Sequence, residues 1–394
     1  MAPSDSIGNN VALVGVGHTE YARTMNRTGL DLIAEATQKA LDDCGLRKED
    51  IDGLATNYGP PLSVDLDIVR EVLGLNVRWY GQTSGGGSNN NPAIQWAAFA
   101  VHHGLANYVA IVFGDDNGYT KGSPTRFGGE ATGRETGTDH YQGSPPYGMT
   151  SPGAAAAMGT RSYFHRYGAT AEQLAAVPIA FRKHASLNPA AMLRDPLTLE
   201  DYLSARYICE PLRRWDYCLV GGGGTCVIVT TAERARDLKK PPVYIMGFQG
   251  IPGGRQEVRF VRPGLGIAQQ DVFDYTPKPE ELTAFQMAGV KREDVDALYT
   301  YDAFSICVWG ALERFGFCGP GEAAAFTQGG RIEMGGELPI NTSGGFLSEA
   351  HVEGWGNQIE IVRQLRGEGG ERQVKDIEVA MYASIFGDAI IYGR

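Results

Sequence analysis

Two segments that lie far apart in this chain carry nearly the same twelve residues. GLRKEDIDGLAT occupies 45–56, and GVKREDVDALYT occupies 289–300. Six of the twelve positions are identical, and four more exchange Lys for Arg or one aliphatic residue for another. Each copy ends a helical pattern and enters a β-prone run. The repeat predicts two similar α/β halves, and a shorter echo links IVFGDD (111–116) to SIFGDA (384–389).

The pattern around the first copy alternates strands with helices. We expect strands at 11–17, 51–56 and 108–116, and helices at 30–45, 67–74 and 93–104. Such alternation is typical of a mixed or parallel sheet that is covered by helices. Residues 117–215 differ, because they begin with a long polar, glycine-rich stretch before helical patterns return. A long irregular segment of this kind indicates a lid or binding loop.

These changes divide the chain into four parts. Residues 1–116 form the first part of an N-terminal half, 117–215 an inserted loop domain, 216–250 the end of the N-terminal half, and 251–394 the C-terminal half. A length of 394 residues is ample for this organisation.

Charge and cysteine usage exclude several classes of function. The net charge of −11 argues against nucleic acid as the main partner, since phosphate binding requires a basic field. No apolar run is long enough to span a membrane, and the N-terminus MAPSDSIGNN lacks signal-peptide regions. The six cysteines form neither CxxC nor a zinc-spaced cluster. We therefore expect a cytoplasmic protein with reduced thiols and no metal site.

Three stretches resemble the thiolase superfamily, and in particular its sterol-carrier-protein type. They are the strand-to-helix stretch DALYTYDAFSI (296–306), the glycine-rich NTSGGFLSEAHVEG (341–354) and the loop-domain helix YGATAEQLAAVPIAFRKHASLNPAA (167–191). The resemblance covers nearly the whole chain. It implies two βαβαβ halves in a five-layered αβαβα arrangement with an inserted loop domain.

The chain departs from the family at both catalytic cysteines. Counting back from Gly104 places the nucleophile at Gly87, or at Gly86 or Ser88 with a one-residue shift, and none is Cys. The second thiol should lie near Ala383 and Ser384, in YASIFGDAIIYG (382–393). A thiolase needs an activated thiolate to form its acyl-enzyme. That covalent route is therefore not available to this chain.

A third departure and one retained residue suggest different chemistry. Tyr301 stands where the family usually has His or Asn, whereas the histidine of the family's His-x-x-Gly motif survives as His351. This combination resembles the lipid-transfer-protein aldolases of steroid side-chain degradation. The resemblance implies retro-aldol cleavage of a β-hydroxyacyl-CoA to a ketone or aldehyde and a shorter acyl-CoA. It also implies no cofactor besides the CoA of the substrate, and a homodimer core joined by a DUF35-class partner with an OB-fold.

Retro-aldol chemistry needs a base for the β-hydroxyl and a donor for the enolate oxygen. Tyr301 is the candidate base, and His351 is the candidate oxyanion donor, together with a backbone N–H of the turn formed by Gly86, Gly87 and Ser88. Tyr299 is two residues away on the same strand and therefore faces the same side. Asp302 is expected to order a helix start or orient a neighbour.

Further residues are candidates for substrate binding. Ser343 and Gly344 lie in the matched glycine-rich stretch, and Lys121 and Arg126, with Arg134 and Arg161, lie where thiolases bind CoA. Simpler interpretations stay open for several of these residues: a tyrosine at a strand end usually packs with its hydroxyl bonded to backbone, Asp302 fits a capping carboxylate, and basic loop residues are usually just solvated.

Two other functions remain possible at this point. The first is a divergent acyltransferase that uses Ser88 or no covalent intermediate, and the second is a non-catalytic thiolase-fold subunit that binds lipid. Thiolase folds dimerise through edge strands, which the resemblance places near 79–83 and 108–112.

Overall fold

The computed structural model describes residues 6–58, 66–84, 90–117, 152–250 and 282–394. The N-terminal half holds β1 (Val11–His18), α1 (Gly29–Cys44), β2 (Gly53–Tyr58), α2 (Leu66–Leu73), β3 (Trp79–Ser84), α3 (Asn90–His102) and β4 (Tyr108–Asp115). It resumes with β7 (Gly223–Thr231) and α8 (Ala232–Ala235).

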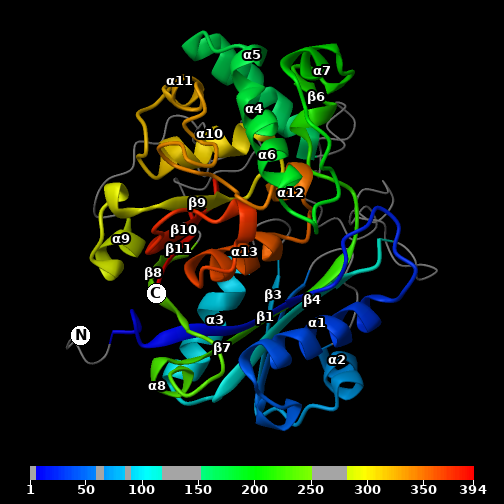
Figure 1. Cartoon of the computed structure of the whole chain (residues 1–394), viewed down its shortest axis with the longest axis vertical. Helices are drawn as coiled ribbons and strands as arrows, with labels where there is room; N and C mark the ends of the chain where they lie inside the picture. The colour runs from blue at the N-terminus through cyan, green and yellow to red at the C-terminus, as the bar shows by residue number, and fades with distance from the viewer. Residues whose placement is uncertain (1–5, 59–65, 85–89, 118–151, 251–281) are drawn as a thin grey trace, which may run out of the picture.

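Between β4 and β7, the described chain forms a largely helical unit at the top of Figure 1. Its elements are α4 (Pro152–Tyr167), α5 (Ala171–Leu174), α6 (Ala176–Ser186), α7 (Leu199–Ser204) and the short strands β5 (Tyr207–Cys209) and β6 (Leu212–Arg213). The C-terminal half holds β8 (Val243–Gln249), α9 (Thr283–Ala288), β9 (Ala297–Thr300), α10 (Ser305–Arg314), α11 (Ala323–Phe326), α12 (Gly345–Ser348), α13 (Trp355–Leu365), β10 (Val379–Ala383) and β11 (Ala389–Gly393).

The strands of the two halves follow the same order. The described strands pair as β3-β2-β4-β7-β1-β8-β11-β10-β9, and a parallel bridge from Leu298 to Ile340 extends this order beyond β9. Outward from the β1–β8 contact, each half has two antiparallel pairings followed by parallel ones. This internal symmetry confirms the duplication that the repeated segment predicts.

The repeated segment folds in the same way in both halves. Gly45 ends α1 and Gly289 ends α9, each in the left-handed conformation with φ of 78° and 69°. A short 3₁₀ turn follows each of them, at Lys48–Asp50 and Arg292–Asp294, and leads into β2 or β9. The shared glycine is explained by its φ, which L-residues with a Cβ adopt only at a cost.

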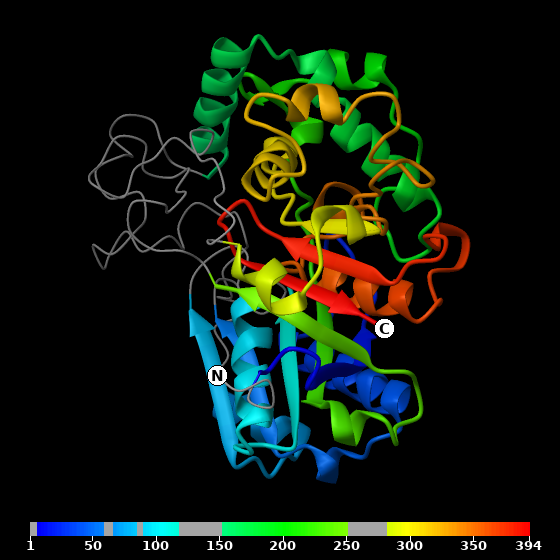
Figure 2. The same cartoon turned by 90° about the vertical axis from the view of Figure 1, so that its left-hand side faces the viewer.

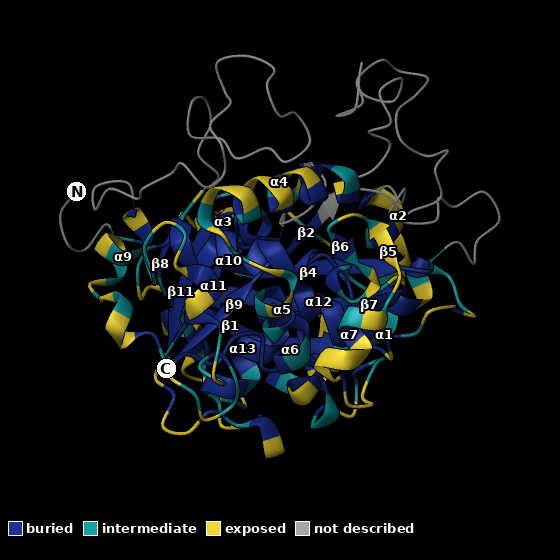
Figure 3. Ribbon diagram, turned by 90° about the horizontal axis from the view of Figure 1, so that it is seen from above, coloured by how far each residue is buried: buried dark blue, intermediate teal, exposed yellow. Residues whose placement is uncertain are grey.

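The elements stack in the five layers that the sequence predicts. In the N-terminal half, the face of the sheet that includes Ala12 and Val14 packs on α1 and α2, while the alternate residues Val11 and Leu13 join the larger core. Helices α3 and α13 lie between the two halves, and α9 and α10 cover the second half. In Figure 3 the central strands and α13 are mostly dark blue, whereas exposed residues lie mostly on peripheral elements such as β5 and α7. Within the described ranges, no helix is long and apolar enough to cross a bilayer.

Two details of the sequence interpretation are wrong. The stretch 108–112 belongs to β4, which lies inside the sheet between β2 and β7, so only β3 provides the expected edge. The shorter echo also lacks structural equivalence, because 111–115 lies within β4 whereas 384–388 forms the turn between β10 and β11. A six-residue match is too short to establish structural equivalence, and the edge assignment comes from the family resemblance, which does not determine which strands pair with β4.

We predict that Gly289→Ala lowers the free energy of unfolding by about 1–2 kcal/mol, the cost of a left-handed alanine. No atom lies within 4 Å of a Cβ at this position, so the loss measures backbone strain alone. Gly289→Asn should cost less, since asparagine tolerates this conformation better. Urea denaturation of the two variants and the wild type checks the order, and equal stability of the alanine variant and the wild type would contradict it.

Candidate active site

The structure brings Tyr301 and His351 together. Tyr301 directly follows β9, and His351 lies in the loop between α12 and α13. The phenol oxygen of Tyr301 and Nε2 of His351 are 3.2 Å apart and share a hydrogen bond, whose direction depends on the imidazole tautomer. Both side chains are buried. The two principal candidates from the sequence therefore form one buried hydrogen-bonded pair.

Two phenylalanines hold this pair in place. Phe346 of α12 meets Tyr301 edge to face, with 4.9 Å between ring centroids, and it meets His351 at 4.8 Å. Phe386, from the turn between β10 and β11, packs on Tyr301 at 5.9 Å. Aromatic surroundings exclude water and strengthen a hydrogen bond through the low local dielectric. The sequence interpretation missed both rings, because they come from segments distant from Tyr301.

Asp302 orients a neighbouring element. Its Oδ2 accepts a hydrogen bond from the backbone N–H of Leu347 in α12, at 3.2 Å. The side chain is completely buried, and this burial raises the pKa of its carboxyl to about 7, against the opposing effect of backbone hydrogen bonds. Asp302 thus fixes the helix that carries Phe346, which matches the orienting role expected of it.

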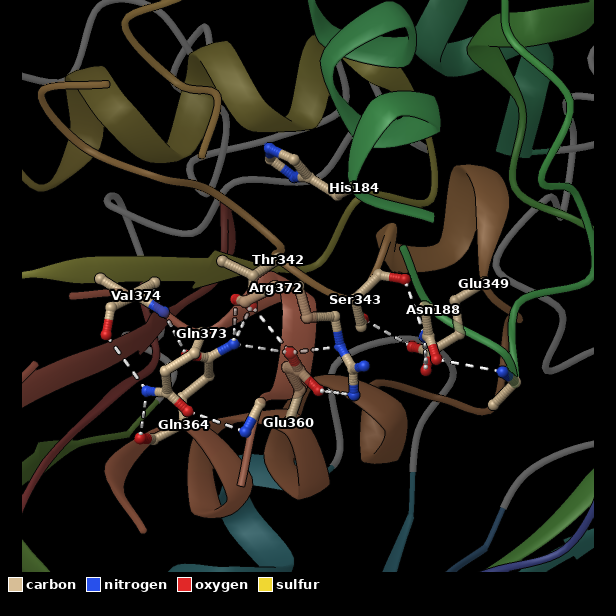
Figure 4. A network of polar contacts seen from close by, with 12 residues as sticks. His184, Asn188, Thr342, Ser343, Glu349, Glu360, Gln364, Arg372, Gln373 and Val374 are labelled. Carbon is tan, nitrogen blue, oxygen red and sulfur yellow. Dashed lines mark hydrogen bonds and ion pairs between the residues drawn. The ribbon is translucent and has the colours of Figure 1, made fainter. Parts of the chain in front are cut away.

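Tyr299 lies in a different polar network, part of which Figure 4 shows. Its hydroxyl is 2.7 Å from Oγ1 of Thr342, which donates to Glu360, and Glu360 is paired with Arg372 at 2.9 Å. Burial raises the pKa of the Tyr299 phenol well above its usual range. The prediction that Tyr299 and Tyr301 face the same side is wrong. β9 ends at residue 300, so the alternation of side chains along the strand does not extend to Tyr301. The two phenols therefore enter separate networks.

Ser343 and Gly344 make packing contacts in this structure. Ser343 donates to Oε2 of Glu349 at 2.6 Å, and Asn188 of the inserted segment donates to the other oxygen of Glu349 (Figure 4). Gly344 has a φ of 105°, and a Cβ there would lie 2.6 Å from Cβ of Ala185. The glycine-rich stretch therefore packs against the inserted segment at Asn188 and Ala185.

Several candidates lie outside the described residues, namely Gly86, Gly87, Ser88, Lys121, Arg126 and Arg134. Arg161 is described, and it forms an exposed ion pair with Glu210 at 3.0 Å. Among the cysteines, burial raises the pKa of the thiols of Cys226 and Cys307 to about 12, which disfavours a thiolate.

A polar chain missed by the sequence interpretation links the two halves beside the site. Asn91 of α3 donates to Asp388 at 2.7 Å and accepts from Gln358 of α13 at 2.9 Å. Tyr392 of β11 donates to Gln358, and Ser384 donates to Asp388. In the sequence, the run of asparagines at 89–91 was the one indication of this polar chain. It could not identify the chain, because the partners of Asn91 come from the other half of the protein.

Sequence comparisons identify relatives that align with most of the chain. A family model described as "Thiolase C-terminal domain-like" matches residues 279–389. A 17-hydroxy-3-oxo-4-pregnene-20-carboxyl-CoA lyase of Mycobacterium tuberculosis is 37% identical over 370 residues, which are 92% of each chain. A steroid side-chain-cleaving aldolase of Thermomonospora curvata is 34% identical, over 90% of each chain.

Solved structures give the same result. A structure named "Ltp2-ChsH2(DUF35) aldolase" superimposes with a TM-score of 0.86 and 32% identity, covering 98% of each chain. A monomeric SCP2-thiolase-like protein of Mycobacterium smegmatis, at 18% identity and a TM-score of 0.70, shares the fold. Fold and site thus define a thiolase-fold protein with a tyrosine–histidine pair. The chain belongs to the thiolase superfamily, in the family of the steroid side-chain-cleaving aldolases.

We predict that Asp302→Asn flattens the pH dependence of stability. The native carboxyl, with a pKa near 7, holds its proton more tightly than the unfolded one near 4. The wild type should therefore lose stability relative to the variant as the pH rises from about 4 to about 7, by at most about 1.4 kcal/mol per pH unit. Urea titrations at pH 5 and pH 8 measure the difference, and parallel changes in both proteins would refute it.

Proposed function

We propose that this protein is an aldolase that cleaves a β-hydroxyacyl-CoA by retro-aldol chemistry, without a covalent acyl-enzyme. The observation that carries the proposal is the buried hydrogen bond between Tyr301 and His351. It supplies a proton-transfer pair in a fold whose nucleophile turn has no cysteine. The kinship with carbon–carbon lyases supports the same reaction class.

The pair accounts for both requirements of the reaction. His351 Nε2 accepts the phenol proton of Tyr301, and the phenolate then removes the proton of the substrate β-hydroxyl. The C–C bond breaks as the new carbonyl forms, and its electron pair moves through the α-carbon to the thioester oxygen. The protonated imidazole of His351 faces this enolate and stabilises its charge. His351 then transfers its extra proton to the α-carbon, which releases the shorter acyl-CoA and leaves Tyr301 and His351 in their starting protonation states.

The proposed substrate is a steroid or similarly bulky side-chain thioester. The compound named for the Mycobacterium tuberculosis relative carries its hydroxyl on C17 and its CoA carboxyl on C20, which makes it a β-hydroxyacyl-CoA. The expected products are a ketone or aldehyde and a shorter acyl-CoA. We assign Ser343, Gly344 and the turn at 86–88 to the acyl site, and Lys121 and Arg126 to the CoA phosphates.

We predict that Tyr301→Phe lowers kcat/KM for C–C cleavage by about 10²–10⁴-fold, the usual contribution of a general base. The fold should survive, because the ring contacts with Phe346 and Phe386 do not need the hydroxyl. The assay follows release of the shorter acyl-CoA by liquid chromatography. Tyr163→Phe, another buried tyrosine, on α4, is the matched control.

The possible outcomes separate the candidate functions. Full activity of Tyr301→Phe would refute its role as the base. Acyl-enzyme formation detected by mass spectrometry would favour an acyltransferase instead. Binding of a lipid without turnover, with and without a partner protein, would favour a non-catalytic subunit.

We further propose a heterotetramer, with a homodimer core and a DUF35-class partner, in the cytoplasm, needing no cofactor besides the CoA of the substrate. Two features support the assembly. β3 is an edge strand with exposed Tyr80, and exposed Trp96 and Phe99 lie on the adjoining α3. The similar structure named "Ltp2-ChsH2(DUF35) aldolase" also pairs an aldolase with a DUF35 protein.

Co-expression tests the assembly. A DUF35-type protein encoded beside this chain should co-purify with it and raise its aldolase activity, and light scattering should give two copies of each chain. Tyr80→Glu should leave a one-to-one complex, since a charge at the edge strand opposes pairing. A monomeric wild type that does not bind the partner would contradict the proposal.

A further inference from the structure

The first residue of α3 carries a buried hydrogen-bond donor that the described chain does not satisfy. Asn90 has no solvent-exposed surface, and its Oδ1 accepts from the backbone N–H of Asn91 at 2.8 Å. This bond fixes the orientation of the amide, so its NH₂ group faces the opposite way. Among the described residues, Nδ2 of Asn90 has no hydrogen-bond partner. Such a donor costs about 1–3 kcal/mol and therefore calls for an explanation.

The free amide lies where two helix N-termini meet. Gly354 caps the N-terminus of α13 with a φ of 87°, and a Cβ on Gly354 would overlap Nδ2 of Asn90 and lie 2.6 Å from the hydroxyl of Tyr382. The absent side chain leaves Asn90 directly against the loop that carries His351, three residues earlier. The N-terminal ends of α3 and α13 both favour negative charge at this position.

The start of α3 is linked to Tyr301 through the turn between β10 and β11. Asn91, next in the chain, is bonded to Asp388 at 2.7 Å, and Phe386 of that same turn packs on the ring of Tyr301. The start of α3 is therefore held by the turn that contacts Tyr301. The side-chain amide of Asn90 faces Gly354, at the end of the loop that carries His351. The contact with Gly354 thus connects Asn90 to the loop of His351, and the bond from Asn91 to Asp388 connects it to the turn that packs on Tyr301.

We propose that Nδ2–H of Asn90 donates a hydrogen bond to the thioester oxygen of the substrate as that oxygen becomes an enolate. The inference rests on the proposed function and adds a third group to it. The amide transfers no proton. It is already fixed by its bond to Asn91, so it stabilises the developing charge without reorganising.

Two variants test this assignment through turnover. Asn90→Ala removes the donor, and Asn90→Asp replaces it with an oxygen while keeping an acceptor for Asn91 N–H. Both should lower kcat/KM for cleavage by about 10²–10³-fold. Urea denaturation of both variants measures their stability, so that a loss of turnover in a variant that stays folded is assigned to the lost donor. Asn76→Asp, an exposed loop position, is the matched control.

A second readout does not depend on cleavage. The carbonyl stretch of a bound acyl-CoA that lacks the β-hydroxyl and carries ¹³C at the thioester carbon reports hydrogen bonding directly. Infrared difference spectra should show a higher frequency in Asn90→Ala than in wild type. If the carbonyl frequency differs between Asn90→Ala and wild type but wild-type protein cleaves no substrate, the contact between Asn90 and the thioester stands and the aldolase function is refuted. Unchanged spectra, with kcat/KM of both variants within about twofold of wild type, would overturn the role of Asn90. In that case a loss of activity in Tyr301→Phe would still support the aldolase proposal.

Discussion

The site depends on the buried hydrogen-bond chain that joins the two halves. Asn91 from the first half contacts both Gln358 and Asp388 from the second, and Tyr392 and Ser384 complete the chain. Each of these polar groups is removed from water, so a shift of one half against the other that kept them buried would leave several of them unsatisfied, at about 1–3 kcal/mol each. Their mutual pairing therefore sets the position of α3 against α13. That position is also what aligns the two helix N-termini.

The arrangement of the two helix N-termini does not depend on the catalytic cysteine of thiolases. A thiolase places its nucleophile at the turn before the helix that here is α3, where a helix N-terminus stabilises a thiolate. The present chain has no cysteine there, yet the two helix N-termini still converge. Their field suits an enolate oxygen as well as a thiolate, since both are anions. Exchange of the catalytic side chains can thus redirect the reaction while the scaffold and its electrostatics stay unchanged.

The sequence predicts the parts of the structure that local patterns determine. The repeat at 45–56 and 289–300 identifies the two halves, because its glycine, charged turn and strand entry obey local conformational rules. The motifs around Tyr301 and His351 predict that these two residues meet, as the structure shows. Sheet order is less accessible, since pairing joins distant segments, and the wrong assignment of 108–112 to an edge has this cause. Phe346 and Phe386 lie within stretches that the sequence analysis quotes, but their roles arise from contacts with Tyr301 that only the folded chain creates.

Burial also sets the charge of the groups around the pair. The carboxyls of Asp302 and Glu349 both have a pKa raised to about 7 by desolvation, and each is held by hydrogen bonds from its neighbours. Two ionised carboxylates beside a developing enolate would oppose its formation through like-charge repulsion. Because a raised pKa keeps much of each carboxyl neutral near pH 7, they orient α12 and the inserted segment at little electrostatic cost. The fold thereby supplies rigid positioning around Tyr301 and His351, and the negative charge of the proposed reaction is left to His351 and the two helix N-termini.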